Sequence, residues 1–142
     1  MTESAHCGRQ IHMTAHALQA VRNTALENNG VAFELWVVIE VLTEARDMNR
    51  EKLIDRLSDL SVHDQASAGR AIDQLRERGL ITTNDQGTIE LTARGEALSG
   101  KVIATRSELR NQLYGGIPSE DIATTNRVLD TIRQRATAIH AS

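Results

Sequence analysis

The spacing of apolar residues predicts a chain built mostly of helices. From about Gln10 to Glu27, apolar residues recur every three or four positions, so they share one face of a helix. The sequence Asn-Asn-Gly at 28–30 ends this helix. A second helix runs from about 33 to 46 and is apolar on most sides, which is typical of a central helix covered by its neighbours.

Two shorter helices are predicted next. Asn49 can cap a third helix, because its side-chain oxygen can accept a hydrogen bond from a free backbone N–H. Ser61 stands three residues before Asp64, as in a capping box, and we expect a fourth helix from 61 to about 78. Gly79 then ends the fourth helix, since glycine readily takes the left-handed conformation found there.

After Gly79 the apolar pattern changes from helical to alternating. Residues 80–83 and 88–91 are β-prone runs on either side of a polar turn, which predicts a hairpin with Ile89 and Leu91 facing inward. Two long helices complete the chain. One extends from a Thr92 cap to about 114, and the other from a Ser119 cap to about 139.

This order of elements predicts a winged helix-turn-helix domain at 33–91. The helix at 61–78 is the recognition-helix candidate, because a single helix fits the DNA major groove while a hairpin can reach the adjacent backbone or minor groove. The predicted fold class is mostly α with a small β-hairpin wing, in one domain of residues 1–142. Residues 1–9 are expected to form a flexible N-terminus.

Four segments resemble the MarR family of transcriptional regulators (multiple antibiotic resistance type). They are Phe-Glu-Leu-Trp-Val-Val-Ile around Trp36, Ser-Ala-Gly-Arg-Ala-Ile-Asp-Gln-Leu-Arg-Glu-Arg-Gly-Leu-Ile at 67–81, Leu-Thr-Ala-Arg-Gly-Glu-Ala-Leu at 91–98 and Ile-Pro-Ser-Glu-Asp-Ile at 117–122. The resemblance implies a homodimer held together by dimerisation helices at 10–29 and 92–139. It also implies a repressor of a palindromic operator, which a small aromatic ligand releases.

The candidate DNA contacts come from the recognition helix, the helix before it and the wing. They are Gln65, Ser67, Arg70, Gln74, Arg50, Lys52, Asn84 and Gln86. The resemblance places Arg70 where the family usually has an arginine, and arginine and glutamine can read guanine and adenine edges. Arg50 and Lys52 are expected to hold phosphates, and the wing residues to touch sugar or base edges. For each residue, the alternative is an ordinary solvated surface.

The charge pattern leaves a second class of function open. The net charge is −3, and residues 50–79 contain as many acidic as basic side chains. The expected wing tip at 82–88 has neither Arg nor Lys, although family members commonly have a basic wing. A neutral winged helix would also suit a protein-interaction module. The direction of the bases discriminates, because a shared face favours DNA and scatter favours a protein partner. These bases are Arg50, Lys52, Arg56, Arg70, Arg76 and Arg78.

Three further groups of residues suggest sensing hypotheses. Phe33 and Trp36, with polar help from His16 and Arg46, could line the ligand pocket that the resemblance implies, or could simply be core and surface residues. His12 and His16, four residues apart, could bind a metal, although no second cluster completes a site. A lone Cys7 could sense oxidants, or could be an incidental thiol. We expect neither a cofactor nor a metal.

Composition narrows the class of protein. The chain has 142 residues, of which 40% are hydrophobic and 2% aromatic, which fits a single helical domain. One cysteine cannot form an internal disulfide, no signal peptide is visible, and the longest apolar stretch is too short to span a bilayer, so a cytoplasmic protein is expected. No catalytic motif is found, and an enzyme is not expected.

Overall fold

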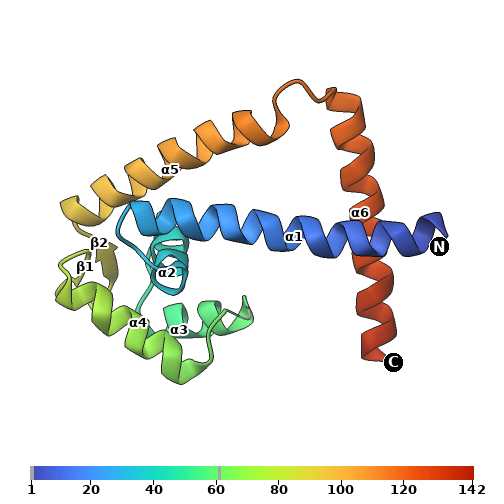
Figure 1. Cartoon of the computed structure of the whole chain (residues 1–142). Coiled ribbons are helices and arrows are strands. Elements are labelled where there is room, and N and C mark those ends of the chain that lie inside the picture. The colour runs from blue at the N-terminus through green and yellow to red at the C-terminus, as the bar shows by residue number, and fades with distance from the viewer. Residues whose placement is uncertain (1, 61) are drawn as a thin grey trace. The chain divides into compact units, whose positions relative to one another are not determined.

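The computed structural model describes residues 2–60 and 62–142, and in these residues it contains helices and one hairpin in the predicted order (Figure 1). The elements are α1 (Glu3–Asn28), α2 (Phe33–Glu44), α3 (Arg50–Asp59), α4 (Gln65–Glu77), β1 (Ile81–Thr83), β2 (Ile89–Leu91), α5 (Ala93–Tyr114) and α6 (Ser119–Ala141). The predicted fold class, mostly α with a small hairpin, is confirmed. Among the described residues, no helix combines the length and apolar character needed to cross a membrane.

The chain divides into two compact units, with the boundary between Arg106 and Ser107, inside α5. The first unit holds the winged helix, α1 and the first half of α5. The second holds the end of α5, a turn with Gly116 at φ 83°, and α6. Pro118, rather than the predicted Ser119, occupies the position before α6, and no side chain caps this helix.

The core of the first unit surrounds α2, as the sequence predicts for a helix that is apolar on most sides. Seven side chains of α2 are buried, namely Leu35, Trp36, Val37, Val38, Ile39, Val41 and Leu42. Helix α3 covers them with Leu53 and Leu57, and α4 with Ile72 and Leu75, all at most 0% exposed. Burial of this apolar surface is the main force that fixes α4 against the domain.

Helix α1 begins at Glu3, so the prediction of a flexible N-terminus at 1–9 is wrong for residues 3–9; Met1 lies outside the described residues. The hydroxyl of Thr2 accepts a hydrogen bond from the N–H of Ala5 at 3.1 Å and caps the helix. The residues after the cap are exposed and carry no apolar period. A helix held by its cap and by propensity alone therefore escapes a reading based on periodicity.

The recognition helix also starts later than predicted, at Gln65 rather than at 61. The carboxylate of Asp64 accepts a hydrogen bond from the N–H of Ser67 at 2.7 Å, so Asp64 is itself the cap. The predicted capping role of Ser61 lies outside the described residues. Gly79 ends α4 as predicted, at φ 74°.

The hairpin is short and firmly attached. β1 and β2 pair antiparallel, with Ile81 opposite Leu91 and Thr83 opposite Ile89. The N–H of Ile89 donates to the carbonyl of Met48 at 2.7 Å, which ties the wing to the loop between α2 and α3. Ile89 is buried and Leu91 packs partly buried against the core, so the predicted inward side of the hairpin is confirmed.

Candidate nucleic-acid interface

Helix α4 buries one side and exposes the other. Its inner side reaches the core through Ala68, Ala71, Ile72 and Leu75. Its outward side exposes Gln65, Ala66, Arg70, Asp73, Gln74 and Glu77. Three of the four candidate contacts predicted on this helix, Gln65, Arg70 and Gln74, are thus open to a partner. Two acidic residues share the surface with them.

The fourth candidate, Ser67, serves the start of the helix instead. Its hydroxyl lies 2.9 Å from Nδ1 of His63 and 3.2 Å from the carbonyl oxygen of Asp64. Nε2 of His63, which is buried, lies 2.8 Å from the carbonyl oxygen of Glu34 in α2. A carbonyl only accepts, so Nε2 is assigned the proton, and Nδ1 of the neutral ring accepts from Ser67. Sequence analysis missed His63 as the anchor between α2 and α4.

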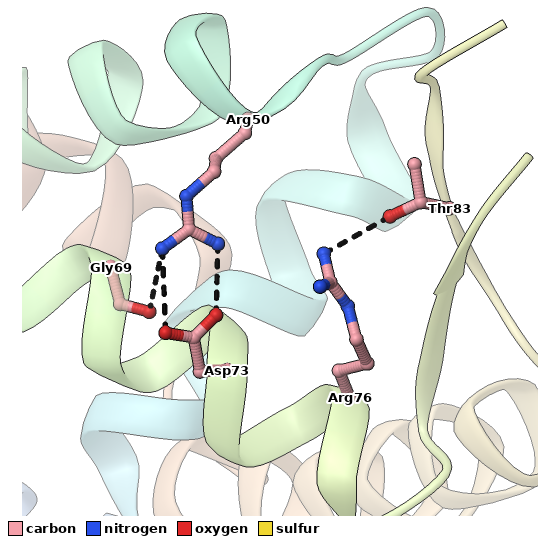
Figure 2. Close-up of polar contacts among 5 residues, drawn as sticks. All are labelled: Arg50, Gly69, Asp73, Arg76 and Thr83. Atoms are coloured by element: carbon pink, nitrogen blue, oxygen red, sulfur yellow. Dashed lines mark hydrogen bonds and ion pairs between the residues drawn. The ribbon is translucent and has the colours of Figure 1, made fainter.

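Arg50 binds another side chain of the interface. Its Nη1 donates to Oδ1 of Asp73 at 2.9 Å, and its Nη2 lies 3.4 Å from both Oδ2 of Asp73 and the carbonyl oxygen of Gly69 (Figure 2). The hydrogen bond from Arg50 holds the pKa of the Asp73 carboxyl below its usual range. Arg50 therefore connects α3 to α4 and neutralises an acid on the outward side of α4, whereas the sequence analysis expected it to hold a phosphate.

Gly69 makes room for this arrangement. A Cβ atom at this position would lie 3.2 Å from Nη2 of Arg50, closer than most real contacts of that kind. The sequence offers one signal for the pair, since Arg50 and Asp73 carry opposite charges on helices predicted to pack together. Sequence separation hides their proximity.

Two more arginines are used inside the domain. Nη2 of Arg76 donates to Oγ1 of Thr83 at 3.2 Å, which ties the end of α4 to the wing (Figure 2). Nη2 of Arg78 donates to the carbonyl oxygen of Gly30 at 2.7 Å, in the turn between α1 and α2. Arg50, Arg76 and Arg78 thus reach three different parts of the domain. By the criterion set above, these three bases are scattered.

The remaining bases lie on two neighbouring helices. Lys52 and Arg56 are exposed one turn apart on α3, and Arg70 is exposed on α4. The side-chain oxygen of Asn49 caps α3 by accepting from the N–H of Lys52 at 2.8 Å, as predicted. These three side chains form no ion pair among the described residues. They are the cations available to a phosphate.

The wing tip presents one of its two candidates. Oδ1 of Asn84 accepts from the N–H groups of Gln86 and Thr88 at 2.9 and 3.0 Å, and Nδ2 donates to Glu90. Asn84 therefore shapes the turn. The side chain of Gln86 is exposed and no hydrogen bond holds it within the described part of the chain.

The four residues predicted to form a ligand pocket do not come together. Trp36 is buried in the core, and the guanidinium of Arg22 lies 3.6 Å from the centre of the half-buried Phe33 ring. His16 is exposed on α1. Arg46 alone lines a cavity, of about 510 Å³, between the end of α2, β2 and α5.

The N-terminal sensing hypotheses find little support in the geometry. His12 and Cys7 are exposed on α1, as is His16. Across residues 2–60 and 62–142, no group of three or more His, Cys, Asp or Glu side chains is placed to hold a metal ion.

A three-helix core with a hairpin, flanked by long helices, defines a winged helix-turn-helix protein. No protein-family model matches the chain. Solved structures narrow the fold. A MarR/EmrR family transcriptional regulator from Acinetobacter sp. ADP1 has 24% identity and a TM-score of 0.70, over 97% of this chain and 99% of that chain. A MarR family protein from Bacillus stearothermophilus has 20% identity and a TM-score of 0.75, over 96% and 99%.

A third similar structure holds small molecules. It is Staphylococcus aureus MarR in complex with salicylate and kanamycin, with 15% identity and a TM-score of 0.78, over 95% of this chain and 93% of that chain. The chain thus has the fold of MarR-type transcriptional regulators over nearly its whole length, and the resemblance seen in the sequence agrees with it. The proteins of this fold compared here are regulators, in line with a chain that is not expected to be an enzyme.

Proposed function

We propose that this protein is a cytoplasmic, dimeric transcriptional regulator of MarR type that binds a palindromic operator and represses from it. The exposed side of α4, anchored on three neighbours, carries the proposal. His63 binds α4 to α2, Arg50 binds it to α3, and Arg76 binds it to the wing. A reading helix needs such fixed placement, because base recognition depends on well-directed hydrogen bonds.

Base reading is assigned to two side chains one turn apart. Arg70 and Gln74 are exposed neighbours at the i and i+4 positions of α4. Arginine pairs with both acceptors of guanine, and glutamine with the donor and acceptor of adenine. Lys52 and Arg56 are placed to hold phosphates, and Gln65 and Gln86 complete the surface. Arg50, Ser67 and Asn84 act by positioning rather than by contact.

The dimer is supported by apolar side chains that remain exposed. Helix α6 has no buried residue in the described chain, yet it exposes Val128, Ile132 and Ile139. Helix α1 exposes Met13 and Leu18 in the same way. Apolar helix faces of this length need a partner, and a second copy related by two-fold symmetry would mirror a palindromic operator.

A protein-interaction module is the second candidate. The observation in its favour is the scatter of Arg50, Arg76 and Arg78, together with a wing tip that has no base. Such a surface attracts DNA only weakly through charge. A neutral protein partner could use the same outward side of α4.

Selection from a random duplex library, followed by a salt titration on the enriched sequence, discriminates the two candidates. The expected result is a palindrome whose logarithmic affinity falls with logarithmic salt at a slope of about −3.6, for two phosphate contacts in each subunit. A flat selection at low salt would refute the DNA-binding proposal. Enrichment of a single half-site, with one chain bound, would refute the dimer.

A further inference from the structure

A second cavity, of about 390 Å³, lies where three helices of the first unit meet. We call it the α1–α4–α5 cavity. Its walls are the C-terminal end of α1, the residues after α4 and the first half of α5. The lining residues are Asn28, Asn29, Arg78, Leu80, Arg94, Ala97, Leu98 and Lys101. No candidate residue from the sequence lies in it except Arg78, which was considered only as a DNA contact.

The charge of this lining is one-sided. It contains Arg78, Arg94 and Lys101 and, among the residues that the structure describes, no carboxylate. None of these three side chains forms an ion pair in the described part of the chain. Arg78 donates only to a neutral carbonyl, that of Gly30. Like charges gathered around one cavity repel each other, and a bound anion relieves that repulsion.

The guanidinium groups of Arg78 and Arg94 are neighbours across a glycine. A Cβ atom on Gly79 would lie 3.2 Å from Nη1 of Arg94, so this guanidinium rests against the residue that follows Arg78. Lys101 lies seven residues after Arg94 on α5, which is two helical turns along the same face. Planar guanidinium groups match carboxylate and phosphate oxygens well.

Apolar side chains lie between these cations. Leu80 is buried and Leu98 is half-buried, and Ala97 stands beside Leu98 on α5. A simple inorganic ion would leave this surface uncovered. An organic anion with an apolar body would cover it while its charged group meets the guanidinium groups.

Hydrogen bonds hold the three walls together without a ligand. Oγ1 of Thr92 donates to the carbonyl of Gly79 at 2.6 Å, which joins α5 to the residues after α4. Nδ2 of Asn29 lies 3.4 Å from Oγ1 of Thr105, which joins α1 to α5, and the bond from Arg78 to Gly30 closes the triangle. A preformed cavity loses little free energy in ordering when a ligand binds.

We propose that the α1–α4–α5 cavity binds a small organic anion that has an apolar body and a carboxylate or phosphate group. The binding itself depends only on the lining. Its effect on regulation rests on the proposed function: Arg78 ends the recognition helix and Leu80 leads into β1, so an occupant would fix both relative to α1 and α5.

Isothermal calorimetry of the full chain without DNA tests the proposal, with benzoate and phenyl phosphate as probes and benzamide as the neutral match. We expect at least one anion to bind and benzamide to bind far more weakly. Arg94→Gln and Lys101→Gln should each weaken anion binding about tenfold, the range for hydrogen bonds to a charged group. Ala97→Phe should also weaken it, by filling the cavity without a change in charge.

Arg9→Gln is the control, because it removes the same charge from an exposed position near the other end of α1. Equal loss in this variant, equal binding of benzamide, or no binding at about 10 mM probe would each overturn the proposal. A random-sequence duplex provides the last arm. If Arg94→Gln and Lys101→Gln weaken duplex binding while neither small anion binds, the lining serves the DNA backbone and the proposal is wrong. Failure of operator selection alone would refute the proposed function and leave anion binding intact.

Discussion

The carboxylate of Asp73 on the outward side of α4 is held at both oxygens by the guanidinium of Arg50, at 2.9 and 3.4 Å. A free carboxylate at this place would face the phosphates of any DNA bound to α4. Because Arg50 neutralises it, the recognition helix can approach DNA with Arg70 as its unpaired charge. The pair converts an acid on a reading surface from an obstacle into an anchor between α3 and α4.

A double-mutant cycle tests this role of Arg50. Arg50→Ala should weaken operator binding roughly three- to tenfold, because it exposes the Asp73 charge. Asp73→Asn in the same chain should restore most of that loss, since the amide carries no charge. Fluorescence anisotropy on the selected operator measures the affinities of both single variants, the double variant and the wild type.

The cycle distinguishes positioning from phosphate contact. If Arg50 held a phosphate directly, Asp73→Asn would restore nothing, and removal of Arg50 would reduce the salt slope by about one in either background. Arg56→Ala supplies the matched comparison on α3, because it should reduce the salt slope whether position 73 is Asp or Asn.

Arg70→Ala should lower specific operator binding by roughly 1–3 kcal/mol, the usual range for loss of a bidentate contact with guanine. Binding to a random duplex should change much less. Anisotropy on both duplexes, with circular dichroism to confirm folding, gives the comparison. An equal loss on the two duplexes would make Arg70 a phosphate contact, and unchanged affinity would remove it from the interface.

Periodicity predicted the elements that bury a face. The central α2, the inner side of α4 and the alternating residues of the hairpin all follow directly from apolar spacing, which is also how burial selects a structure. The first turns of α1 were missed because a side-chain cap, not burial, defines them. The start of α4 was placed too early because Ser61 and Asp64 are both good caps by residue type, and only three-dimensional geometry shows that Asp64 holds the free N–H of Ser67.

Candidate contacts were predicted by residue type and helical position, and this separates them unevenly. Gln65, Arg70 and Gln74 are exposed as expected, because exposure follows from the period of α4. Ser67 and Arg50 are engaged by His63 and Asp73, partners on or near other helices. Such long-range pairs depend on how helices pack, which a single sequence does not encode in any local pattern.

Asp64 makes the start of α4 sensitive to acid. The hydrogen bond from the N–H of Ser67 is the main cause that lowers the pKa of Asp64 in the folded chain below its ordinary value of 3.8. A lowered folded pKa stabilises the fold above the unfolded pKa, and this contribution is lost as the pH falls below about 4 through the folded value. Asp64→Ala should therefore lower the melting temperature at pH 7.

The same substitution should have a smaller effect at pH 3, where the protonated Asp64 of the wild type caps α4 less well. Differential scanning fluorimetry at several pH values follows the difference between the two melting temperatures. Asp85→Ala is the control, because Asp85 is an exposed acid of the wing turn. A pH-independent difference for Asp64→Ala would show that its charge does not contribute to the cap.

Ile132→Glu tests whether α6 holds the dimer together. Ile132 is 40% exposed and lies one helical turn from Val128, which is 48% exposed, so the two form a continuous apolar strip on a helix without buried residues in the described chain. In a two-fold dimer, burial of an unpaired carboxylate on this strip should weaken association about a hundredfold or more. Size-exclusion chromatography with light scattering should then show a monomer at concentrations where the wild type is a dimer. Gln134→Glu adds the same charge to an exposed polar position of α6 and should leave the dimer unchanged. A normal dimer for Ile132→Glu would mean that another face of the chain forms the dimer, whereas dissociation by both variants would point to general charge repulsion rather than to the strip.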